Sequence, residues 1–80
     1  MSNLEKYNKA FIDTFEINES QLANLAYQGI KAWDSVGHMT LMAALENAFD
    51  IMIDVDDIID FSSYEKGKEI LQKADYGVEF

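Results

Sequence analysis

Apolar side chains recur at three- and four-residue steps in several short stretches of this chain, and this spacing limits the possible folds more than any other feature. In the first stretch the steps join Leu4, Tyr7, Phe11 and Phe15. Such steps place side chains on one face of an α-helix, whereas a half-buried strand alternates at every second residue. Because the chain has only 80 residues, the pattern predicts one small all-α domain spanning residues 1–80.

Capping residues precede the apolar stretches and locate the helix starts. Ser2 and Glu5 fit a capping box, and the helix that they begin is expected to end near residue 15. Either Asp34 or Ser35 can cap a second helix that continues to about Asp50. The buried stripe of this second helix is expected to consist of Leu41, Met42, Leu45 and Phe49.

A short third helix is expected at residues 54–61, which read DVDDIIDF. Acidic residues in its first turn are favoured there by the helix dipole. Just before it, Ile51 and Ile53 alternate with polar neighbours, so a short strand is possible, although no pairing partner is evident.

The segment Ser62-Ser63-Tyr64-Glu65 repeats the capping-box pattern and predicts the start of a fourth helix. Gly67 would weaken this helix by up to ~1 kcal/mol relative to alanine. Residues 75–80 are expected to form a frayed tail. The inner face of this helix is expected to consist of Tyr64, Ile70, Leu71 and Ala74.

A 19-residue connection, residues 16–34, separates the first two helices. Connections of this length in small domains are usually functional or contain a short helical turn. The whole pattern thus predicts a bundle of three longer helices, one short third helix and a long first loop. Four apolar residues are expected to attach the loop to the core: Ile17, Leu22, Leu25 and Ile30.

Negative charge is concentrated in one part of the chain. The net charge is −9, from 15 acidic residues and six lysines, and residues 34–61 contain seven acidic residues and no lysine. Such a surface repels nucleic acid, but it can be either a solvated face or a docking surface for basic proteins. No apolar run approaches the ~20 residues that span a bilayer, and no secretion signal is evident. We therefore expect a soluble, cytoplasmic monomer.

Two other functions are disfavoured by the residues themselves. A calcium-binding loop starting at Asp54 would have Asp56 and Glu65 in place, but Ile58 and Ile59 stand where a ligand and a glycine are required. An enzyme is disfavoured because the chain has one histidine and no cysteine or arginine. Ser35 and His38 lie three residues apart, but no third group is evident to orient the imidazole. His38 is therefore expected to be a solvent-exposed helix residue.

The segment Trp33-Asp34-Ser35-Val36-Gly37-His38-Met39 resembles the acyl carrier and peptidyl carrier proteins, whose signature is Asp-Ser followed by an aliphatic residue. Residues 45–50, LENAFD, are similar to the Leu-Glu-x-x-Phe end of the family's second helix. The resemblance covers essentially the whole chain and implies the family's four-helix fold. It also implies that Ser35 carries 4′-phosphopantetheine as a phosphodiester, with acyl or aminoacyl cargo attached to the arm as a thioester. A helix N-terminus accommodates such an anion well.

The same resemblance assigns roles to residues around the serine. Asp34 would assist the attaching transferase. Gly37 and Thr40 stand where carriers of fatty acid synthesis are commonly acidic, so the chain is closer to stand-alone carriers of specialised pathways. The partner-docking face would consist of Val36, Met39, Ala43, Glu46, Asp50, Asp54, Asp56, Asp57 and Asp60.

Partners implied by the resemblance are a phosphopantetheinyl transferase, a ligase that loads acyl or aminoacyl groups, and a downstream acyltransferase or synthase. The chain itself would be a carrier and not a catalyst, with no metal and no cofactor besides 4′-phosphopantetheine. Because the chain has no cysteine, no second thiol would compete for the cargo. The alternative is a small acidic interaction domain, or adaptor, whose serine is unmodified. The identity of the cargo and the pathway stay open.

Overall fold

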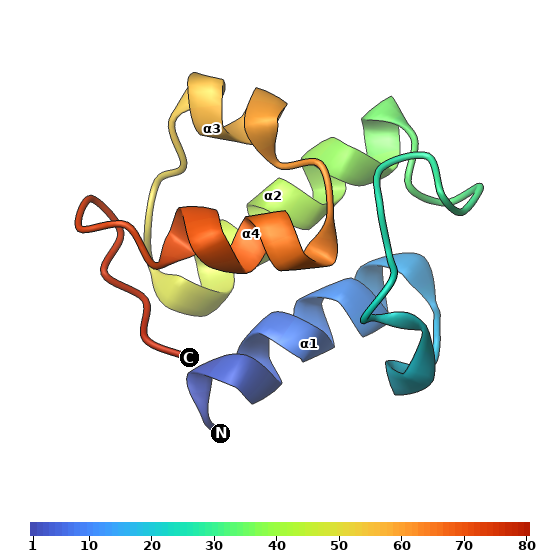
Figure 1. Cartoon of the computed structure of the whole chain (residues 1–80), viewed down its shortest axis with the longest axis horizontal. Coiled ribbons are helices and arrows are strands. Elements are labelled where there is room, and N and C mark those ends of the chain that lie inside the picture. Colours follow the sequence, from blue (N-terminus) through green and yellow to red (C-terminus); the bar gives the residue numbers. More distant parts are fainter.

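The computed structural model describes all 80 residues and shows four α-helices and no β-strand (Figure 1). The all-α prediction is therefore confirmed, and the short strand considered near Ile51 does not form. The helices that pack against each other most extensively are α1 and α2, and the two chain ends lie close together at the lower edge of the view (Figure 1). The elements are α1 (Asn3–Phe15), the 3-10 helix η1 (Glu19–Gln21), α2 (Ser35–Phe49), α3 (Val55–Asp60) and α4 (Tyr64–Leu71).

Side-chain caps start the helices near the predicted positions. Ser2 Oγ accepts from the Glu5 amide at 3.1 Å, and Glu5 Oε1 accepts from the Ser2 amide at 3.0 Å, so the capping box of α1 is confirmed. In α4 the cap is Ser63, whose Oγ accepts from the Lys66 amide at 3.0 Å. The predicted capping box with Glu65 does not form, because Ser63 and not Ser62 occupies the cap position and the residue three positions later is Lys66.

A single aromatic-rich core joins the helices and the loops. Most of the predicted stripe residues are buried in it, but Leu4 is 39% exposed and Phe49 is only partly buried. Ala74 lies beyond the end of α4 and is exposed, which corrects its assignment to the inner face. The largest fully buried side chains are Trp33, Tyr7, Phe11, Phe61, Leu41, Met42, Leu45, Ile70 and Leu71.

The long first loop is fixed to the turn between α3 and α4. Leu25 O accepts from the Tyr64 amide at 2.9 Å, and the Tyr27 amide donates to Ser62 O at 2.9 Å. Leu22 and Leu25 are buried, and Ile17 and Ile30 pack against the core, as the sequence predicts. These contacts fix the middle of the loop against the turn between α3 and α4, eight residues before α2 begins.

The C-terminal residues differ from the frayed tail that the sequence predicts. Val78 is buried, and its amide donates to Leu71 O at 3.0 Å. The Phe80 ring lies edge-on to Tyr7, with 5.1 Å between the ring centroids. The tail therefore covers one side of the core, because Val78 and Phe80 contribute apolar surface that helices of this length leave open.

Asp57, in α3, is only 8% exposed. Its carboxylate accepts from Lys73 Nζ at 2.7 Å and from the Tyr76 hydroxyl at 2.5 Å. The bond from Lys73, and then the bond from Tyr76, hold the pKa of the Asp57 carboxyl below its ordinary value of 3.8. Removal from water, and then the bond to Asp57, raise the pKa of Tyr76 to about 12. Asp57 therefore fastens α3 to the segment after α4.

This carboxylate makes part of the stability sensitive to acid. Because the pKa of Asp57 is lower in the folded chain than in the unfolded chain, its contribution is complete above about pH 4 and is lost as the pH falls through the folded value. We expect Asp57→Asn to lower the urea midpoint at neutral pH and to flatten its decline on acidification. Asp56→Asn, at an exposed neighbouring position, is the matched control. An unchanged pH dependence in Asp57→Asn would contradict this role.

Candidate functional site around Ser35

Ser35 is the first residue of α2 and its side chain is exposed. The cap is supplied by Asp34, whose Oδ1 accepts from the Gly37 amide at 2.8 Å. Of the two cap candidates in the sequence, the structure thus selects Asp34. Ser35 Oγ makes a different contact, lying 3.2 Å from the Tyr27 hydroxyl. The Ser35 hydroxyl therefore does not cap the N-terminus of α2.

Gly37 lets the loop before α2 pass directly over the first turn of the helix. A Cβ at this position would lie 3.1 Å from the Ala32 carbonyl carbon and 3.2 Å from Phe15 Cε1, and it would clash with the Ala32 oxygen. No acidic side chain fits here. The absence of an acidic residue at position 37 therefore has a packing cause.

A surface cavity of about 400 Å³ opens beside Ser35, between the start of α2 and α3. The exposed surface of its wall is mostly apolar, and its polar groups come from the serine, a tyrosine, a histidine and a second serine. A site with an apolar wall and a few polar groups is typical of small-molecule binding. The lining residues are Tyr27, Ser35, His38, Met39, Ile58, Ile59, Phe61 and Ser62.

His38 is partly buried, which corrects the expectation of a solvent-exposed helix residue. Its Nδ1 accepts from Trp33 Nε1 at 2.8 Å, and its Nε2 lies 2.7 Å from Ile58 O. An indole N–H can only donate, so Nδ1 is unprotonated and Nε2 carries the proton donated to Ile58. The imidazole thus joins the loop, α2 and α3 behind the serine, with neither nitrogen directed at Ser35.

Several apolar side chains that follow the serine on α2 are exposed. Val36 and Met39 are strongly exposed and Ala43 is exposed, as a docking role requires. Sequence reasoning missed three further residues on the adjoining segment, which are Met52, Val55 and Ile59. The four-residue spacing of Val55 and Ile59 could have indicated these two, because it places both on one face of a short helix. Since this six-residue helix packs on the core through Ile58, the face with Val55 and Ile59 stays in solvent.

The acidic residues assigned to the docking face do not all lie on it. Glu46 is partly buried, and its Oε2 accepts from the Ile53 amide at 2.9 Å. The assignment of Asp57 to the docking face is corrected, because its carboxylate is buried against Lys73 and Tyr76 and is not available to a partner. The exposed members are Asp50, Asp54, Asp56 and Asp60, together with Asp34 beside the serine.

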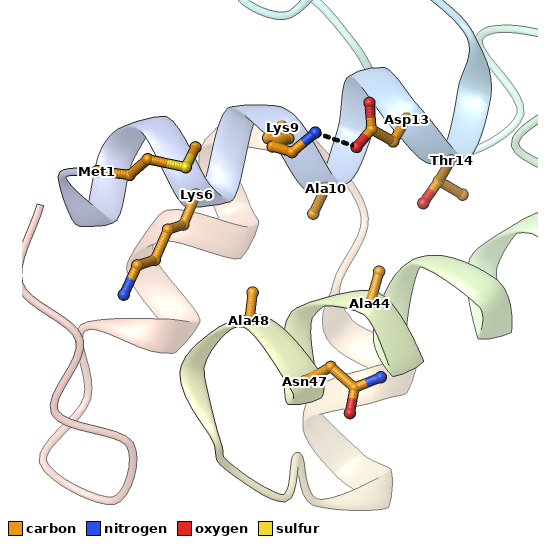
Figure 2. Close-up of a pocket in the computed structure, with 9 residues that line it drawn as sticks. All are labelled: Met1, Lys6, Lys9, Ala10, Asp13, Thr14, Ala44, Asn47 and Ala48. Atoms are coloured by element: carbon orange, nitrogen blue, oxygen red, sulfur yellow. Dashed lines mark hydrogen bonds and ion pairs between the residues drawn. The ribbon is translucent and has the colours of Figure 1, made fainter.

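A second groove, with a volume of about 320 Å³, lies between α1 and α2. In Figure 2, Ala10 points toward Ala44 and Ala48 across the groove, and Lys9 is joined to Asp13 on the rim. Ala44 lies nine residues after Ser35, which is roughly 13 Å along the helix axis. The groove is therefore separate from the cavity beside the serine.

The acidic and histidine side chains form no group of three or more that could hold a metal ion. Each helix is too short or too polar to span a membrane. Comparisons of the chain with protein-family models, curated proteins and solved structures found no match.

Proposed function

We propose that this chain is a carrier protein of the acyl or peptidyl carrier type, with 4′-phosphopantetheine attached to Ser35. The observation that carries the proposal is the state of the Ser35 hydroxyl. The hydroxyl is exposed at the start of α2 and borders an apolar cavity. Because Asp34 caps the helix, the Ser35 hydroxyl is not needed as a cap. A serine retained only as a helix cap would accept from an amide of the first turn, and Ser35 does not.

The modification has a simple atom balance. Ser35 Oγ attacks the β-phosphorus of coenzyme A, so an Oγ–P bond forms and the phosphoanhydride P–O bond breaks. Adenosine 3′,5′-bisphosphate leaves, and a base of the transferase takes the serine proton. The product is a phosphodiester at a helix N-terminus, where unpaired amides and the helix dipole favour negative charge.

The surroundings of the serine suit transient docking of partner enzymes. Val36, Met39 and Ile59 provide apolar contacts, and exposed carboxylates on α3 provide charge for a basic partner surface. We propose that the transferase, a loading ligase and a downstream acyltransferase or synthase use this face in turn, in the cytoplasm. Acyl or aminoacyl groups would travel between them as thioesters on the arm.

The test is the intact mass of the protein after incubation with coenzyme A, magnesium and a broad-specificity phosphopantetheinyl transferase. We expect the mass to increase by one phosphopantetheine unit. A known carrier, treated in parallel, shows that the transferase is active. If the control is modified and this chain is not, the proposal is wrong, and the small acidic interaction domain becomes the better interpretation.

The docking face makes a separate prediction about charge. Asp56→Lys reverses an exposed charge on α3 and is expected to raise the KM of the transferase about two- to fivefold. The effect should shrink as salt is added, because exposed charges are screened. Glu79→Lys makes the same charge change in the C-terminal tail and serves as the control. Equal KM values for the two variants would argue against this face.

A further inference from the structure

The side chain hydrogen-bonded to Ser35 belongs to a residue that the sequence did not indicate. The Tyr27 hydroxyl lies 3.2 Å from Ser35 Oγ, and either atom can donate the hydrogen bond. Tyr27 belongs to the long first loop, eight residues before the serine. Its proximity is created by the tertiary structure, so no local sequence pattern reveals it.

Tyr27 is held in position from two sides. Its amide donates to Ser62 O at 2.9 Å, and the preceding residue, Ala26, forms an antiparallel bridge with Ser63. Its ring packs edge-on against Trp33, with ring centroids 6.4 Å apart, and against His38, with centroids 5.3 Å apart. Because Trp33 is fully buried and is hydrogen-bonded to His38, this aromatic support is fixed. The phenol is therefore oriented before any ligand arrives.

The chemistry of the Tyr27–Ser35 pair changes when Ser35 becomes an ester. The unmodified serine hydroxyl can donate or accept, whereas the ester oxygen has no proton. Tyr27 is then the only donor of the pair, and a negatively charged phosphodiester oxygen is a stronger acceptor than a neutral hydroxyl. The Tyr27 hydroxyl is hydrogen-bonded to Ser35 and not to Asp34, whose Oδ1 accepts from the Gly37 amide.

We propose that Tyr27 is the positioning residue for the prosthetic group. Its phenolic hydroxyl donates to an oxygen of the phosphodiester on Ser35 and fixes the first bonds of the arm beside the cavity. This inference rests on the proposed function, because it requires that Ser35 be modified.

The test compares the wild-type chain with Tyr27→Phe, which keeps the ring and removes the hydroxyl. Tyr64→Phe removes a phenol bonded to Asn8 on another part of the fold and is the control. Each protein is fully modified with coenzyme A and the transferase, and the ³¹P NMR spectrum of the phosphodiester is recorded. We expect the ³¹P resonance to move in Tyr27→Phe and to stay in place in Tyr64→Phe.

Steady-state kinetics of the transferase provide a second measurement. Because the hydrogen bond acts on the reacting group and not on docking, Tyr27→Phe should lower kcat about three- to tenfold with little change in KM. If Tyr27→Phe is modified and both its ³¹P chemical shift and its kcat equal those of wild type, this inference is wrong and the proposed function stays intact. Absence of modification in the wild-type chain would overturn both.

Discussion

Replacing Ser35 by alanine is expected to abolish modification of the chain by the phosphopantetheinyl transferase. The loss should be complete, because the proposed reaction needs an oxygen nucleophile at this position and alanine has none. The fold should survive, since Asp34 and not Ser35 caps α2. Exposed substitutions of this kind change the free energy of unfolding by about 0.5 kcal/mol or less, so the melting temperature should move by no more than about 4 °C.

Ser62→Ala is the matched control for this experiment. Ser62 is also exposed and lines the same cavity, but it does not stand at the start of α2. We expect Ser62→Ala to be modified at the wild-type rate. Modification of Ser35→Ala to the same extent as wild type would contradict the assignment of the attachment site. A melting curve of Ser35→Ala that matches the wild-type curve excludes unfolding as the cause of any loss of modification.

The second large effect is expected at Gly67, in α4. Alanine has the higher helix propensity by about 1 kcal/mol, so propensity alone predicts that Gly67→Ala stabilises the protein. The packing predicts the opposite. A Cβ on Gly67 would lie 2.6 Å from Phe61 Cε1 and would clash with the Phe61 ring tip and the Tyr7 hydroxyl. Both rings are fully buried, and the Tyr7 hydroxyl donates to Tyr64 O at 2.7 Å.

We expect Gly67→Ala to lose about 3 kcal/mol of stability, because overpacking and a broken buried hydrogen bond outweigh the gain in propensity. For a domain of this size that corresponds to a melting temperature about 12–24 °C lower. Glu69→Ala, at an exposed position of the same helix, should melt within a few degrees of wild type. A Gly67→Ala variant as stable as wild type would contradict the close packing of α4 against Phe61 and Tyr7.

Features set by neighbours in the sequence could be predicted. The capping box at Ser2 and the start of α2 at Asp34-Ser35 depend on residues within one helical turn, so local spacing reveals them. The same holds for the short α3, whose acidic first turn is visible in the sequence. Local sequence is therefore enough to place Ser35 at a helix start and acidic residues on the adjoining helix.

Features set by residues distant in the sequence could not be predicted. Asp57 looked like its exposed neighbour Asp56, and only contact with Lys73 and Tyr76, 16 and 19 residues away, makes it structural. Gly67 looked like a weak point of its helix until Phe61 and Tyr7 were seen against it. Tyr27 reaches Ser35 only because the loop is fixed to the turn between α3 and α4.

The most direct test of the central claim is the position of the added group in the modified chain. Trypsin cleaves after lysine, so it releases residues 32–66 as one peptide, whose serines are Ser35, Ser62 and Ser63. Fragment-ion masses of this peptide assign the modification to a single residue. The proposed function predicts phosphopantetheine on Ser35 alone. Its presence on Ser62 or Ser63, or an unmodified peptide when a control carrier is fully modified, would contradict the proposed function.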